Sequence, residues 1–286
     1  LLKTEAGRRV YERFQAIEPN SDKAEWLSMA NELFVDMMRG NLVKSDVYQG
    51  DIWKRVTSNA DNYNTPGTFT AFIGYEWTSW GSKWDNENDP YESELLGGLH
   101  RVIIFKDAAE KVNQIRPFSF LDSQDPEALW RFMDGYEKKT GGEVLAIPHN
   151  GNLSKGEMFA PFDFEGRPLN KAYARTRSRW EPLMEVAQVK GVSETHPILS
   201  PTDGFADYEI WNGYDGTTLD GVKTEGWIER KKLEYARPAL KLGLEQQSKL
   251  GENPFKFGMI GSTDAHTSLA TADENNFWGK MTNMEP

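Results

Sequence analysis

Short apolar segments that alternate with helix-forming segments constrain this fold more than any other feature of the sequence. The apolar segments are rich in β-branched, aliphatic and aromatic residues and are too short for helices. They span residues 68–77, 102–105, 144–147, 183–189, 208–211 and 257–260. We interpret them as strands. Strands that alternate with helices favour a parallel sheet or barrel, so the sequence predicts the α/β class.

Helix signals separate these segments. Asp125 is a predicted N-cap, because Pro126 and Glu127 follow it in the first turn and Gly141 ends the apolar stripe. The other predicted helices begin at Ser21 or Asp22 and end before Gly40, span residues 46–60, and span residues 226–250 with an interruption at Pro238.

The length and the even composition favour one domain. A chain of 286 residues corresponds to one large α/β barrel or to about two ordinary domains. The sequence contains no internal repeat, low-complexity tract or Gly/Ser linker, and its charges are mixed throughout. We therefore predict a single domain over residues 1–286, with insertions near 81–98 and 152–182.

Charge and composition exclude several functional classes. The sequence contains 33 Lys and Arg residues and 44 Asp and Glu residues, which gives a net charge of −11. A negative protein repels the phosphates of nucleic acids, whose attraction to positive residues dominates nucleic-acid binding. No apolar stretch approaches the roughly 18 residues of a membrane span. The absence of Cys excludes disulfides, thiol nucleophiles and thiolate metal sites. A small-molecule substrate is the expected partner.

Acidic residues and histidines follow the predicted strands. Glu76 ends the first strand, His149 follows the third, and Asp264 and His266 follow the last. In α/β barrels and parallel sheets the carboxyl ends of the strands carry the ligand site, so these side chains are expected to meet there. A single histidine of this kind is most often a hydrogen-bonded structural residue; the repetition at several strand ends favours a metal site.

The residue types narrow the choice of metal. Asp264 and His266 are two residues apart, so both point to the same side if the chain stays extended. Imidazole and carboxylate ligands without thiolate suit Zn, Mn or Fe, and a site with two metals needs a bridging carboxylate. Glu76 is the candidate bridge.

Four strings carry a resemblance to a known family. They are Gly74-Tyr75-Glu76-Trp77-Thr78-Ser79, Ala146-Ile147-Pro148-His149-Asn150-Gly151-Asn152-Leu153, Gly191-Val192-Ser193-Glu194-Thr195-His196-Pro197 and Gly261-Ser262-Thr263-Asp264-Ala265-His266-Thr267. In their content and order they resemble DUF3604, a bacterial family of unknown function. That family looks like a branch of the PHP (polymerase and histidinol phosphatase) metal-dependent hydrolases.

The resemblance implies a PHP-like distorted (β/α)7 TIM-type barrel with two or three divalent metal ions. By residue it implies that Glu76 bridges the metals and that His149, His196, Asp264 and His266 are further ligands. His100 has no counterpart in the family, and we expect it at the rim of the pocket or as a partner that orients a ligand.

The sequence departs from the PHP pattern at its beginning. PHP proteins open with His-x-His after the first strand and continue with Asp-His, and neither string occurs here. We therefore expect Leu1 to begin downstream of both, in a fragment that lacks the first strand or strands and several ligands. Location in the cytoplasm or the periplasm then depends on the missing N-terminus.

The activity implied by the resemblance is phosphoester hydrolysis by a metal-bound water. Glu76, Asp264, His266 and Arg101 are the expected catalytic residues. Cations available for phosphate are Arg101 and Lys155, which neighbour proposed site residues, then Lys190 and the run Arg167, Arg175, Arg177 and Arg179. Within the run, Arg175 and Arg179 are four residues apart on a predicted helix, which is more typical of a solvated helix face. Two alternatives use the same ligands: a non-catalytic metal- or ligand-binding module, and a metal hydrolase of amides or non-phosphate esters.

Overall fold

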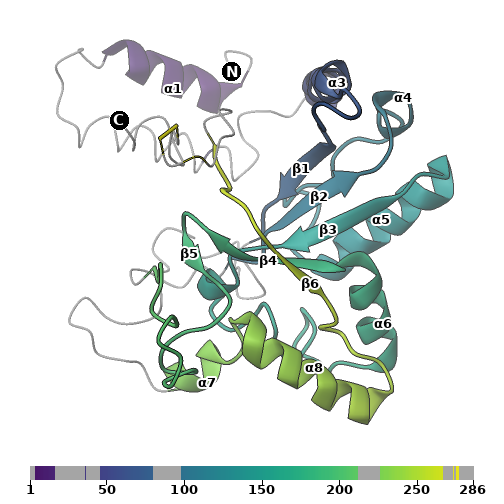
Figure 1. Ribbon diagram of the computed structural model, residues 1–286. Coiled ribbons are helices and arrows are strands. Elements are labelled where there is room, and N and C mark those ends of the chain that lie inside the picture. Colours follow the sequence, from purple (N-terminus) through teal and green to yellow (C-terminus); the bar gives the residue numbers. More distant parts are fainter. Residues whose placement is uncertain are drawn as a thin grey trace. The chain divides into compact units, whose positions relative to one another are not determined.

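Figure 1 shows the computed structural model of the chain, which describes residues 4–16, 36, 46–79, 98–211, 226–266, 273, 275 and 276. The sequence predicts one continuous domain, and the contacts in the structure divide the chain into two compact units. Unit 1 comprises Leu1–Ile73 and Asp107–Ser123, and unit 2 comprises Gly74–Lys106 and Gln124–Pro286.

Unit 1 is helical in its described part, with α1 (Glu5–Ala16), α3 (Asp46–Tyr63) and α4 (Ala109–Val112). Side chains of α3 fix the segment around α4: Thr57 donates to Asn113 Oδ1 at 2.9 Å, and Asp61 accepts from the Ala109 amide at 2.8 Å. The predicted helix over 46–60 is confirmed. The helix predicted from Ser21 or Asp22 lies outside the described residues, apart from Asp36.

The first sheet has the order β1-β2-β3 and consists of β1 (Ile73–Trp77), β2 (Arg101–Phe105) and β3 (Val144–Pro148). β2 and β3 are antiparallel, with Arg101 opposite Pro148 and Phe105 opposite Val144. The expectation of a parallel sheet is therefore wrong for this pair. Since the strands run in opposite directions, the start of β2 lies beside the end of β3.

The second sheet has the order β5-β4-β6 and consists of β4 (Leu183–Gln188), β5 (Gly191–Val192) and β6 (Gly258–Gly261). β4 is parallel to β6 and antiparallel to β5. β3 and β4 contact each other, although they belong to different sheets. The α/β class is confirmed, and the strands among the described residues do not close into a barrel.

Residues 208–211, predicted as a strand, form no strand in the structure. Glu209 has a left-handed backbone with φ 48°, which a strand does not allow. Its carbonyl accepts a hydrogen bond from the Val192 amide at 3.1 Å, so the segment still lies against β5.

Four α-helices and one 3₁₀ turn complete the described part of unit 2: α5 (Pro126–Thr140), η1 (Gly151–Leu153), α6 (Lys171–Trp180), α7 (Trp227–Lys231) and α8 (Ala236–Leu250). α5 begins and ends as predicted, because Asp125 accepts from the Glu127 amide at 2.8 Å and Gly141 adopts φ 64°. The helix predicted over 226–250 is interrupted before Pro238, between α7 and α8, and not at Pro238 itself. Pro238 occupies the first turn of α8, where a proline is tolerated.

The core of unit 2 lies between the sheets and the helices. α5 and α6 contact β3 and each other. Fully or nearly buried side chains from many segments form one cluster: Leu99, Met158, Phe159, Leu169, Met184, Ala239 and Phe255. Three of these come from residues 152–182, so the region expected as an insertion contributes to the core. In the described part of the chain, no helix has the length and apolar character that a bilayer crossing requires.

A buried ion network joins β2 to α6. The carboxylate of Glu181 accepts from Arg101 Nε at 2.9 Å, from Arg177 Nε at 3.0 Å and from Trp130 Nε1 at 3.0 Å. Burial alone would raise the pKa of Glu181, but the two guanidinium groups hold it below its ordinary value. The carboxylate is therefore ionised, and its contribution to stability is present at neutral pH and lost as the pH falls through the folded-state pKa.

We expect Glu181→Gln to destabilise the protein by about 3–5 kcal/mol at neutral pH, because it leaves two buried guanidinium groups without their counter-charge. Glu137→Gln is the matched control, since it breaks an ion pair with the exposed Arg179 and should change the free energy of unfolding by less than about 1 kcal/mol. Urea unfolding at neutral pH measures both. Equal effects of the two substitutions would contradict a structural role of the buried network.

Candidate metal centre

Glu76 lies near the end of β1, in unit 2, and its side chain is 28% exposed. His100 immediately precedes β2, and its Nδ1 lies 2.6 Å from Glu76 Oε1. His100 was expected at the rim of the pocket or as a partner that orients a ligand, and the structure places it in direct contact with the candidate bridging carboxylate. The reason is the strand arrangement, which brings the start of β2 to the site.

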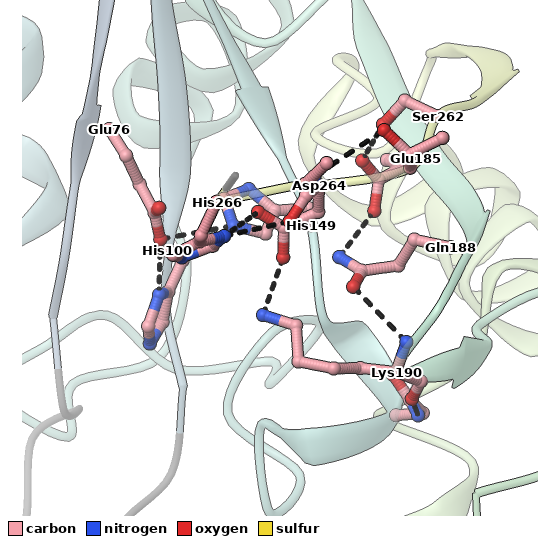
Figure 2. Close-up of polar contacts among 12 residues, drawn as sticks. Glu76, His100, His149, Glu185, Gln188, Lys190, Ser262, Asp264 and His266 are labelled. Carbon is pink, nitrogen blue, oxygen red and sulfur yellow. Dashed lines mark hydrogen bonds and ion pairs between the residues drawn. The ribbon is translucent and has the colours of Figure 1, made fainter. Parts of the chain in front are cut away.

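His149 follows β3 and is 1% exposed at its side chain. Its backbone amide donates to the His100 carbonyl at 3.2 Å, which extends the β2–β3 ladder beyond the two strands. Its Nε2 lies 3.2 Å from the same oxygen of Glu76 that contacts His100. The three side chains therefore converge from the three strands of one sheet (Figure 2).

Asp264 and His266 reach the centre from the end of β6. Asp264 has φ 50°, so the segment is not extended and the expected alternation of side chains does not apply. His266 Nδ1 instead lies 2.8 Å from the Asp264 carbonyl oxygen and 3.7 Å from its Oδ1. The two side chains still lie close together, through a turn rather than through strand geometry.

Glu76 is common to two groups of potential metal ligands. One group contains Glu76, His100 and His149, and the other contains Glu76, Asp264 and His266. Within each group, one ligand atom from every residue lies within 4.8 Å of the others. A carboxylate shared in this way is a candidate bridge between two cations.

Electrostatics keep Glu76 ionised and favour neutral His100. Burial alone would raise the pKa of Glu76, but hydrogen bonds from His100 and His149 outweigh it and hold the pKa well below its ordinary value. Burial lowers the pKa of His100, although its hydrogen bond to Glu76 opposes that effect. An ionised carboxylate and a neutral imidazole are the forms that bind metals.

One further observation fits a metal. Nδ1 of His149 is buried and has no hydrogen-bond partner among the described residues. Buried polar atoms without a partner are uncommon and indicate a water or ion that completes the site. With imidazole and carboxylate donors and no sulfur, the set fits Zn, Mn or Fe.

Two residues predicted for the site are in neither group of potential ligands. In the described part of the chain His196 belongs to neither group; its ring packs against Trp227 and Tyr235 with centroid separations of 5.6 and 5.8 Å. Its Nδ1 accepts from the Ile198 amide at 3.2 Å. Arg101 points to the opposite face of β2 from His100, as neighbouring strand residues do, and pairs with Glu181.

Of the predicted phosphate-binding cations, Lys190 contacts a residue of the centre. Its Nζ lies 2.6 Å from Asp264 Oδ2 (Figure 2). The four arginines of the run at 167–179 each pair with a carboxylate outside the centre: Asp163, Glu252, Glu181 and Glu137. For Lys155, the remaining predicted cation, the structure gives a left-handed backbone with φ 53° in the turn that follows η1.

A polar network that the sequence analysis did not predict lies behind Asp264. Glu185, on β4, accepts from Ser262 Oγ and, at 2.7 Å, from Gln188 Nε2. Gln188 Oε1 accepts from the Lys190 amide at 3.3 Å. This chain of contacts connects the segment that carries Asp264 with the one that carries Lys190. Burial raises the pKa of Glu185, against the opposing hydrogen bond from Ser262.

Comparison with known proteins identifies one family. The model of the family described as "Protein of unknown function (DUF3604)" matches residues 1–286. The search of curated proteins and the search of solved structures each found no match.

We expect Glu76→Gln to weaken the binding of two equivalents of Mn²⁺ by at least about tenfold, because the shared carboxylate loses its charge. His266→Ala should weaken one equivalent only. Titration of the protein with Mn²⁺, followed by calorimetry, measures both. Glu194→Gln, which alters an exposed carboxylate paired with Arg237, is the control and should bind as the unaltered protein does. Loss of a single equivalent in Glu76→Gln would contradict a shared ligand.

His196→Ala distinguishes two expectations for His196: the family resemblance implies a metal ligand, whereas the structure leaves this residue out of both groups of potential ligands. Because the ring packs between aromatic side chains, we expect this substitution to reduce stability by about 1–3 kcal/mol and to leave the bound metal unchanged. Thermal unfolding and elemental analysis of the same sample measure the two effects. A loss of one metal equivalent in a folded His196→Ala protein would show that His196 is a ligand after all.

Proposed function

The chain belongs to the DUF3604 family, whose function is unknown, and we propose that it is a metal-dependent hydrolase of phosphoesters. The observation that carries this proposal is the sharing of the Glu76 carboxylate by two groups of potential ligands. We place the centre in a PHP-like barrel to which the described strands contribute. The contact between β3 and β4 and the parallel pairing of β4 with β6 support that placement.

The residues of the two groups would hold two divalent cations. One group joins Glu76 with His100 and His149, and the other joins Glu76 with Asp264 and His266. When bound, such cations lower the pKa of a coordinated water and neutralise the charge that builds up on phosphoryl oxygens. The negative charge of Glu76 and Asp264 offsets part of the positive charge of the cations.

Neighbouring side chains fix these ligands in place. The contact of 2.6 Å between Glu76 and His100 restrains the carboxylate, and Glu76 is itself held on β1. The Glu185–Ser262 hydrogen bond restrains the turn that carries Asp264. Ligands whose positions are fixed in this way need little reorganisation when a substrate binds.

Lys190 supplies a fixed positive charge to the same place. Its ammonium group contacts Asp264 at 2.6 Å and is 14% exposed. An ammonium group at this position can donate to a phosphoryl oxygen that approaches the centre. A substrate that carries a phosphate is therefore favoured over an uncharged ester or amide.

The test is hydrolysis of p-nitrophenyl phosphate and its diester by the protein loaded with Mn²⁺ or Zn²⁺. We expect activity that a chelator removes, and a loss of more than about 100-fold in Asp264→Asn and His149→Ala, beyond what the loss of a merely orienting partner causes. Asp134→Asn, on the exposed surface of α5, is the control and should keep full activity. Metal binding without hydrolysis of either ester would favour the binding module, and hydrolysis that survives the chelator would refute the proposal.

A further inference from the structure

A pocket of about 760 Å³ in unit 2 shares two lining residues, Gln188 and Ser262, with the polar network behind Asp264. Three segments line it, from the end of β4 to the start of β5, at 209–211, and from the end of β6 onward: Ala187, Gln188, Val189, Gly191, Glu209, Ile210, Trp211, Gly261, Ser262 and Thr263. Thr263 directly precedes Asp264, and Gln188 and Ser262 belong to the polar network beside it (Figure 2). The pocket therefore lies beside the segment that carries Asp264.

The wall formed by residues 209–211 is fixed against β5. The Val192 amide donates to the Glu209 carbonyl at 3.1 Å. Gly191 has φ 94°, and a Cβ added there would lie 2.7 Å from Cβ of Trp211 and 2.8 Å from its backbone nitrogen. Only glycine permits this approach. Glu209 is held in a left-handed conformation at the same place, and strained backbone of this kind is concentrated at functional sites.

The lining of the pocket selects for an uncharged group. Val189 and Trp211 present apolar surface, with 40% and 38% of each residue exposed, and Ile210 is a third apolar residue of the lining. Glu209 is the one ionisable residue among those that line the pocket, so an anion would meet a negative charge and no counter-charge. An indole ring in such a wall favours aromatic or aliphatic surface.

We propose that this pocket binds the alcohol part of the substrate, an uncharged aromatic or branched aliphatic group, next to the phosphate at the metal centre. This inference rests on the proposed phosphoesterase function and names its substrate class: phosphate esters of apolar alcohols. In the reaction, the bond from phosphorus to the alcohol oxygen breaks and a bond from phosphorus to the water oxygen forms. The alcohol oxygen takes up a proton from the water, so alcohol and phosphate are the products.

Kinetics with two substrates test the pocket. We expect Trp211→Ala to raise the KM for benzyl phosphate about tenfold, which corresponds to the loss of one aromatic contact, and to leave the KM for glycerol phosphate unchanged. Trp211→Phe should restore most of the affinity for benzyl phosphate. Phe69→Ala, which removes an exposed aromatic side chain from unit 1, is the control for both substrates.

A binding measurement separates this inference from the proposed function. We expect benzyl alcohol to bind the unaltered protein in ligand-observed NMR, with binding lost in Trp211→Ala and weaker for the benzoate anion. Binding that depends on Trp211 without hydrolysis of any phosphate ester would support the pocket and refute the phosphoesterase. Hydrolysis of both esters with equal KM, unaffected by Trp211→Ala, would overturn the pocket and leave the phosphoesterase in place.

Discussion

The candidate site depends on the contact between one carboxylate and two histidines. Glu76 Oε1 lies 2.6 Å from His100 Nδ1 and 3.2 Å from His149 Nε2, and each of the three residues is held by a different strand of the β1-β2-β3 sheet. A partly buried carboxylate must be compensated by hydrogen bonds or by cations, since burial alone disfavours its charged form. Asp264 and His266, which form the second group of potential ligands with Glu76, add further polar atoms around the Glu76 carboxylate.

The opposite face of β2 carries a second electrostatic interaction, with a structural role. His100 and Arg101 are neighbours in the chain, so their side chains lie on opposite faces of the strand. Arg101 joins Arg177 in the buried pair with Glu181, and thus connects β2 to the end of α6. Breaking this pair would leave charge buried without a partner. The intact pair therefore restricts movement of β2 and of His100, which precedes the strand.

Local signals predicted part of this structure well. Asp125, Pro126 and Gly141 determine the ends of α5 through short-range hydrogen bonds and backbone conformation, and all three act as the sequence indicated. The position of Glu76 at a strand end, together with the family resemblance, indicated a shared carboxylate. The pairing direction of β2 and β3 could not be predicted, because it depends on contacts between distant segments. His100 was therefore expected only at the rim or as a partner that orients a ligand, and not within a group of potential ligands. The left-handed turn at Asp264 and the pairing of Arg101 with Glu181 also depend on tertiary contacts, so they could not be predicted either.

The most direct test of the account is anomalous diffraction from crystals of the protein grown with Mn²⁺ or Zn²⁺. The account predicts two metal peaks about 3.5–4 Å apart, with the Glu76 carboxylate bound to both at about 2.0–2.2 Å. His100 and His149 should lie at one peak, and Asp264 and His266 at the other. A single peak without Glu76 among its ligands, or no peak at the centre at full metal saturation, would contradict the central claim.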